Sequence, residues 1–310
     1  MPQDNLDAVA VASPARSEGS APFTVLACTT AIIITVGIMA GPSQPTWDQM
    51  AKWGYLPAER IWDGALWALI SSAFVHVALW HLVFNVYWLW QFGRVVEREL
   101  GSFRFLVFVV GAAFVSSAFQ LAASGDTGIG ASGVVYGLLG LMWRSKKEVP
   151  RFAEILGPDT TSLFFVWLVA CFVATRAGFV SIGNTAHLTG LLFGVLVAES
   201  RRAAWHYRLA RGSLGLLCAL SLLAAHFNPW SERWLEHFAM KLHRDGQYER
   251  AALAYERSLA LGADSAWAFH NLALTYASMG DSTRSADALR RLRATAPTEA
   301  DSLQLRLRRR

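Results

Sequence analysis

A serine and a histidine, Ser132 and His187, lie in strongly apolar parts of the chain. Polar residues are costly in such surroundings unless they have a partner or a function. A histidine within hydrogen-bond reach of a serine can accept its proton, which makes the serine oxygen a nucleophile for acyl transfer. Because the apolar segments around these two residues contain no carboxylate, the sequence predicts a Ser/His dyad.

Acyl transfer also needs hydrogen-bond donors for the oxyanion of the tetrahedral intermediate, each worth about 3 to 4 kcal/mol. His81 and Asn85 are four residues apart and share one helix face. Together with the backbone N–H of Ser132 they are the available donors. Tyr136, one turn after Ser132, is placed to pack against the imidazole and orient it in place of a carboxylate.

The elements that must position these residues are membrane helices. The chain has 310 residues, of which 54% are hydrophobic and 16% charged, and this composition is typical of a membrane protein. A bilayer core about 30 Å thick needs roughly 20 apolar residues per helix. We expect an all-α, polytopic bundle of six helices and a shorter seventh, at residues 23–40, 79–96, 103–123, 131–143, 161–178, 185–198 and 214–227. Cys28, Cys171 and Cys218 fall in these segments, where we expect small buried hydrophobes.

Basic residues set the expected orientation. Lys and Arg cluster after the second, fourth and sixth segments, and such loops are usually cytoplasmic. We therefore expect a cytoplasmic tail at residues 1–21, and the polar residues at the starts of segments two, four and six near the outer surface. The net charge of +5 follows from these loops and requires no nucleic-acid partner.

Small residues explain how Ser132 could meet His187. Gly133 and Gly190 each begin a pair of glycines four residues apart, and the second pair ends at Gly194. Such pairs let two helix backbones approach closely. The fourth segment spans only about 20 Å at 1.5 Å per residue, so we expect the preceding ASGDTGIG to dip into the protein and line a wet cavity.

Three motifs in this order resemble the second, fourth and sixth helices of rhomboid intramembrane serine proteases. They are HVALWHLVFN at 76–85, GASGVVYGLLG at 130–140 and AHLTGLLFG at 186–194. The likeness covers about residues 47–199 and includes GRVVERELGS at 93–102. Gly130 opens the second motif and, with the helix glycines, is expected to support the site.

The resemblance implies a six-helix core in which Ser132 is the nucleophile and His187 the general base. It also implies that His81 and Asn85 help form the oxyanion hole and that Tyr136 supports the histidine. Members of this family cut transmembrane substrates at or near the outer membrane boundary, and they need no metal or cofactor. We therefore expect an integral protein of the bacterial inner membrane whose site faces the extracytoplasmic side.

The first outer loop departs from the family pattern. Many members have Trp-Arg before the histidines of the second helix, whereas Trp67 is here followed by Ala68. The loss affects loop stability or lipid contact rather than the dyad. We expect the loop to be an amphipathic segment at the membrane interface, with the aromatic residues Trp47, Trp53, Tyr55, Trp62 and Trp67.

Two further polar residues have structural interpretations. His76 is interpreted as a loop or cap residue, and Asn184 as a helix cap. Ser132 or His187 alone would also be interpreted as a packing residue, but their joint occurrence favours catalysis. The alternative is an inactive rhomboid-like protein that binds transmembrane clients.

The composition changes after residue 228. The segment repeats with a shift of 34 residues, which aligns Gly246 with Gly280 and Ala263 with Pro297, and it resembles tetratricopeptide repeats. Two repeats are fewer than the three usually needed for independent stability. We therefore expect them to pack against the membrane domain, to pair with another copy or to dock a protein partner. A small appendage without a ligand is the simpler alternative.

The expected organisation is therefore a tail at 1–21, a protease core at 22–200, a linker and seventh helix at 201–230, and repeats with a basic tail at 231–310. If the seventh helix crosses the bilayer, the repeats lie on the active-site side. If it lies on the surface, they are cytoplasmic. Crossing is the favoured interpretation.

Overall fold

The computed structural model describes residues 19–41, 45–180, 182–202 and 207–308. These residues form helices and connecting loops without a strand, so the predicted all-α class is confirmed. Residues 1–18 of the expected tail, 203–206 of the linker and 309–310 of the basic end lie outside the described residues.

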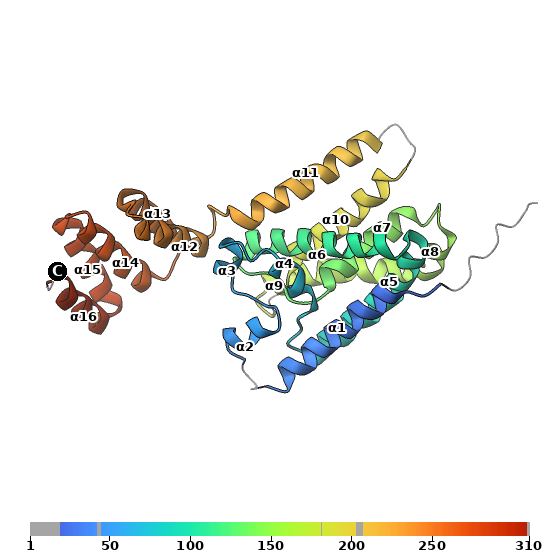
Figure 1. Cartoon of the computed structure of the whole chain (residues 1–310), viewed down its shortest axis with the longest axis horizontal. Coiled ribbons are helices and arrows are strands. Elements are labelled where there is room, and N and C mark those ends of the chain that lie inside the picture. The colour runs from blue at the N-terminus through green and yellow to red at the C-terminus, as the bar shows by residue number, and fades with distance from the viewer. Residues whose placement is uncertain (1–18, 42–44, 181, 203–206, 309–310) are drawn as a thin grey trace, which may run out of the picture.

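A bundle of long helices forms the larger part of the molecule (Figure 1). Long helices that follow one another in the chain run in opposite directions, so the starts of the second, fourth and sixth predicted segments lie at one end. The helices are α1 Pro22–Met39, α5 Leu79–Leu100, α6 Ser102–Ser124, α7 Ser132–Ser145, α9 Pro158–Arg176, α10 Asn184–Ser200 and α11 Tyr207–His226, with a short α8 at Pro150–Ile155.

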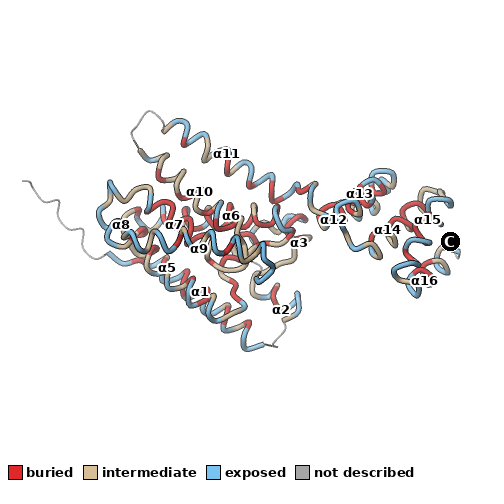
Figure 2. The backbone as a smooth tube through the Cα atoms, turned by 180° about the vertical axis from the view of Figure 1, so that it is seen from behind, coloured by how far each residue is buried: buried red, intermediate tan, exposed pale blue. Residues whose placement is uncertain are grey.

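Four helices of the described part are long and apolar enough to cross a membrane, namely α1, α6, α9 and α11. A fifth span results if α5 is joined with the short helices before it, at a bend of 101°. The remaining two predicted segments, α7 and α10, have only 14 and 17 residues. Every residue from Gly133 to Met142 of α7 is buried (Figure 2), so this helix is surrounded by protein and needs no length matched to lipid.

The close approach of α7 and α10 rests on glycines. A Cβ added to Gly190 would overlap the carbonyl oxygen of Gly133, and one added to Gly194 would overlap that of Gly137. Only residues without a side chain allow two helix backbones to come this near. This contact brings the first turn of α10 beside the first turn of α7.

The start of α1 is held by a carboxylate from α5. Glu97 is 1% exposed and accepts hydrogen bonds from the backbone N–H of Phe23 and Thr24, at 3.0 and 2.8 Å, and from the Thr24 hydroxyl at 2.7 Å. A helix start leaves N–H groups without partners and favours negative charge. Glu97 therefore fixes α1 against the bundle.

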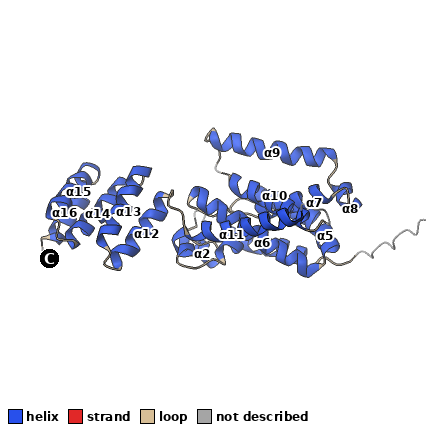
Figure 3. Ribbon diagram, turned by 90° about the horizontal axis from the view of Figure 1, so that it is seen from above, coloured by secondary structure: helices blue, strands red, loops and turns tan. Residues whose placement is uncertain are grey.

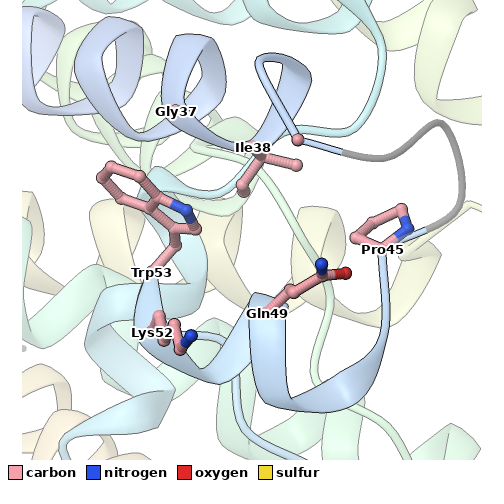
Figure 4. A pocket seen from close by; sticks show the side chains of 7 residues that line it. Gly37, Ile38, Pro45, Gln49, Lys52 and Trp53 are labelled. Atoms are coloured by element: carbon pink, nitrogen blue, oxygen red, sulfur yellow. The ribbon is translucent and has the colours of Figure 1, made fainter.

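The loop between α1 and α5 contains α2 Trp47–Lys52, α3 Ala58–Trp62, α4 Ala68–Ser71 and the 3-10 helix η1 Ser72–Phe74. Trp53 of this loop lies against Gly37 of α1, beside a small cavity of about 80 Å³ (Figure 4). Trp47 and Trp67 are about half exposed, as expected for an interfacial segment. The expectation is wrong for Trp62, which is 7% exposed because helices α6, α11 and α12 (Glu232–Arg244) cover it.

The C-terminal part is a separate set of helices at the same end of the bundle as α3 (Figure 1). The 34-residue shift aligns Gly246 with Gly280. Each of these glycines comes shortly after the end of a helix and has a positive φ, 74° for Gly246 and 76° for Gly280. Tyr255, Tyr276 and Leu292 lie in its core. The helices are α12 Glu232–Arg244, α13 Tyr248–Leu261, α14 Ser265–Ser278, α15 Ser282–Thr295 and α16 Pro297–Leu307.

One carboxyl group gives this C-terminal part a pH-dependent stability. Burial, followed by the nearby charges of Glu232 and Asp264, raises the pKa of Glu236 from 4.5 to about 7. Between these two values the folded state keeps a proton that the unfolded state has lost, so stability falls as pH rises from about 4.5 to 7. We expect Glu236→Gln to remove this slope and to raise the unfolding temperature at pH 8 by about 4 °C, with no gain at pH 4.5.

The measurement is pulsed proteolysis within residues 232–308 of the full-length protein over temperature and pH. Glu249→Gln, an exposed carboxyl at the start of α13, is the matched control and should keep the wild-type slope. An unchanged slope in Glu236→Gln would contradict the assignment.

Candidate active site

Ser132 is the first residue of α7, and the loop before it enters the bundle. Gly130 in this loop has φ of 98°, a backbone conformation that favours glycine. A Cβ there would lie 2.5 Å from Cε1 of His81 and 3.2 Å from Nε2 of His76. The loop can therefore pass directly against both imidazoles only because residue 130 is glycine.

The Oγ of Ser132 lies 2.8 Å from Nε2 of His187. Ser132 begins α7, whereas His187 lies in the first turn of α10, and the glycine contact between these helices sets their separation. This distance is within hydrogen-bond reach for transfer of the serine proton to the imidazole. The two residues that the sequence predicts as a dyad are thus brought together.

The ring of His187 is stacked on that of Tyr136, with centroids 4.7 Å apart and an angle of 26° between the planes. The Tyr136 hydroxyl donates to the carbonyl oxygen of Phe164, 3.1 Å away on α9, which fixes the tyrosine. No described residue forms a hydrogen bond with Nδ1 of His187, which is buried. The imidazole is therefore oriented by stacking.

The two predicted donors from α5 lie next to this pair. Asn85 is 1% exposed, and its Nδ2 donates to the carbonyl oxygen of His81 at 2.9 Å, which leaves a second amide hydrogen for another acceptor. The rings of His81 and His76 are 5.0 Å apart. His76 lies in the loop before α5, as expected, but it is fully buried beside His81.

These side chains surround one cavity of about 550 Å³. Its polar part contains Ser132, His187, His81 and Asn85, so the predicted dyad and the two predicted donors line one space. The lining also has an apolar part, formed by Val77, Trp80 and Phe84 from α5 and the loop before it, and by Phe164, Trp167 and Cys171 from α9. A cavity with a few convergent polar groups and apolar walls suits a peptide segment.

Helix α9 forms the loosest wall of this cavity, and Figure 3 shows it along one flank of the bundle. Only Phe164 and Cys171 of its 19 residues are buried. Its contact with α5 includes the rings of Trp167 and Phe84, 5.9 Å apart. The apolar wall between α5 and α9 is therefore held by a few aromatic side chains.

Sequence reasoning missed Gln120, a buried residue of α6. Its Oε1 accepts the backbone N–H of Ala186 at 3.1 Å, next to His187, and its Nε2 donates to Ser124 Oγ at 3.0 Å. The signal was a long amide side chain in an otherwise apolar helix. Gln120 satisfies an N–H at the start of α10 and so helps to fix the turn that carries His187.

The interpretation of Asn184 as a helix cap is wrong. Gly183 occupies the cap position, and Nδ2 of Asn184 donates to Thr175 Oγ1 of α9 at 2.9 Å. The Asn184 side chain thus connects α10 to the end of α9 by a hydrogen bond. The three cysteines are free, with Cys28 and Cys171 buried and Cys218 partly so. Within the described residues, no three His, Cys, Asp or Glu side chains are grouped to hold a metal ion.

Comparison with known families supports one of the possible classes for this site. Residues 63–202 match the Rhomboid domain. This rhomboid segment contains Ser132, His187 and both donors from α5. The match and the apolar helices support the rhomboid family for this part of an integral membrane protein.

Curated relatives carry the same family name. The chain is 36% identical over 151 residues to Rhomboid protease GlpG of Serratia proteamaculans, covering 49% of this chain and 54% of the relative. It is 31% identical over 188 residues to Rhomboid protease GlpG of Yersinia pseudotuberculosis and of Yersinia pestis, covering 60% of this chain and 65% of each relative. The chain thus spans less than two thirds of the length of these relatives.

Proposed function

We propose that this protein is an intramembrane serine protease that cleaves peptide bonds in or next to transmembrane segments through Ser132 and His187. The observation that carries the proposal is the 2.8 Å distance between Ser132 Oγ and His187 Nε2 inside the cavity. The similarity to proteins named Rhomboid protease GlpG supports it.

The chemistry follows from the groups in the cavity. His187 Nε2 takes the proton of Ser132 while Oγ attacks the substrate carbonyl carbon, and the carbonyl oxygen becomes an oxyanion. His81, Asn85 and the Ser132 backbone N–H donate to that oxygen. The protonated imidazole then gives its proton to the leaving amine, so the C–N bond breaks and an acyl-enzyme forms. Water attacks the acyl group by the same route and restores the serine.

Substrates of this site are transmembrane proteins. The apolar wall between α5 and α9 supports entry from the lipid, because few side chains hold α9 in place. We place the site on the extracytoplasmic side of the bacterial inner membrane, which the basic loops after α5, α7 and α10 support. The C-terminal helices resemble tetratricopeptide repeats and serve to dock a protein partner or substrate.

The decisive experiment is labelling of the purified protein with a fluorophosphonate, which reacts only with an activated serine. We expect labelling of the wild type and none of Ser132→Ala. Equal signals from both proteins would refute the protease and favour an inactive protein that binds transmembrane clients.

A second prediction concerns Asn85, whose side chain lines the cavity and has a second amide hydrogen available. Asn85→Ala removes one oxyanion donor, so we expect kcat to fall about 100-fold while Ser132 still reacts with fluorophosphonate. The measurement pairs reporter cleavage with labelling. If labelling disappeared together with turnover, Asn85 would have a structural role instead.

A further inference from the structure

The C-terminal helices are attached to the membrane bundle by a charged stripe on α12. Arg233, His237 and Lys241 are spaced by four residues and therefore share one helix face. His237 Nε2 and Lys241 Nζ both contact Oδ1 of Asp63 on the loop after α3, at 3.0 and 3.1 Å. The stripe thus meets acidic groups of the loop between α1 and α5.

Arg233 makes the contact that reaches the active-site loop. Its Nη2 lies 2.9 Å from Glu59 Oε1 on α3, and its Nη1 lies 2.7 Å from Asp126 Oδ1. Nη1 also donates to the carbonyl oxygen of Gly125 at 3.4 Å. One guanidinium therefore bridges α3 and the first two residues of loop 125–131, as its planar set of donors allows.

An apolar seam keeps α12 in this position. Trp234 and Leu235 of α12 pack with Trp62 of α3 and with Leu121 of α6 in one buried cluster. The indole Nε1 of Trp230 donates to the carbonyl oxygen of Ala122 at the end of α6, 2.6 Å away. Buried apolar contacts of this kind fix the orientation of α12 relative to the bundle, whereas exposed salt bridges alone contribute too little to do so.

Loop 125–131 leads directly into Ser132. Beyond Arg233, it is held by Tyr55, whose hydroxyl donates to the Thr127 carbonyl oxygen at 3.2 Å, and by Ser72, whose carbonyl oxygen accepts from Gly130 N–H at 3.2 Å. Its Gly130 lies against His81. A shift at the start of this loop would therefore move the first residues of α7, including the backbone N–H of Ser132, and change the contact of Gly130 with His81.

We propose that Arg233 is a positioning residue of the protease, through which the docked C-terminal helices hold loop 125–131 in its reactive arrangement. The proposal rests on the protease function proposed above. Arg233 touches neither the dyad nor the donors, so it acts through Asp126 and Gly125. The C-terminal helices thereby become part of the active unit.

The test uses the Arg233→Met variant of the full-length protein. This substitution keeps an aliphatic side chain and removes the guanidinium group. We expect kcat to fall about tenfold with KM within about twofold, and the rate of fluorophosphonate labelling to fall by the same factor. Arg290→Met is the matched control, because Arg290 pairs with Asp287 inside α15, so this variant should keep the wild-type rate. A wild-type labelling rate in Arg233→Met would overturn the proposal.

A double-mutant cycle separates positioning from general destabilisation. If Arg233 acts through Asp126, the Arg233→Met, Asp126→Asn double variant should be no slower than the slower single variant. Effects that multiply would overturn the proposal, since they would mean that the two residues act independently.

Hydrogen exchange of loop 125–131 gives a readout that does not depend on catalysis. Exchange in this loop should rise about tenfold in Arg233→Met and stay unchanged in Arg290→Met, and an unchanged loop would overturn the proposal. If the wild type were not labelled at Ser132, the protease function would fail while the exchange result would still decide the role of Arg233.

Discussion

Ser132→Ala and His187→Ala are each expected to lower cleavage of a single-span reporter at least about 1,000-fold. The serine supplies the nucleophile, and the histidine, 2.8 Å away, accepts its proton. Neither residue can therefore carry out the reaction without the other. For the same reason the double variant should be no slower than either single variant. The measurement is the rate of product formation by purified protein in detergent or proteoliposomes.

The control for this prediction is a second serine of the cavity wall, which has no histidine partner among the described residues. Ser116 also lines the cavity, but its hydroxyl donates to the carbonyl oxygen of Ala112 in its own helix, at 2.7 Å. Ser116→Ala should therefore retain at least about a tenth of the activity, since only a local hydrogen bond is lost. Retained cleavage by Ser132→Ala or His187→Ala would rule out the dyad.

The pairing of Ser132 with His187 could be predicted from the sequence because polar residues in apolar helices are rare and must be explained. Ser132, His187, His81 and Asn85 stood out for this reason, and alternating topology placed them at one depth. The glycine pairs in α7 and α10 indicated which helices touch. The helical class followed from composition in the same way.

What could not be predicted depends on contacts between distant segments. Asn184 was assigned to a cap because its position suited one, but its partner Thr175 lies on another helix. The sequence around Trp62 suggested an interfacial tryptophan, but in the structure α12 packs over its side chain. The bridge from Arg233 to Glu59 and Asp126 joins residues more than 100 positions apart, and no local pattern marks such a pair.

Gly190→Ala is expected to lower cleavage about 100-fold, although residue 190 lies one turn away from the dyad histidine. A Cβ at this position would overlap the carbonyl oxygen of Gly133 and crowd its carbonyl carbon, which are backbone atoms and cannot rotate away. The helices must therefore separate, which moves Ser132 away from His187. A displacement of about 1 Å in a reactive pair can cost this much rate. Reporter cleavage and the labelling rate of Ser132 should fall together.

Two other glycines serve as controls and predict an order of effects. A Cβ on Gly137 would lie 3.2 Å from Ala112 Cβ and 3.4 Å from the Gly190 carbonyl oxygen, so Gly137→Ala needs only a small adjustment. Gly215 of α11 has no atom within 4 Å of such a Cβ, and Gly215→Ala should be neutral. The expected order of loss is thus Gly190, then Gly137, then Gly215. If helix propensity rather than helix separation controlled activity, all three variants would behave alike, because each replaces a helical glycine by alanine.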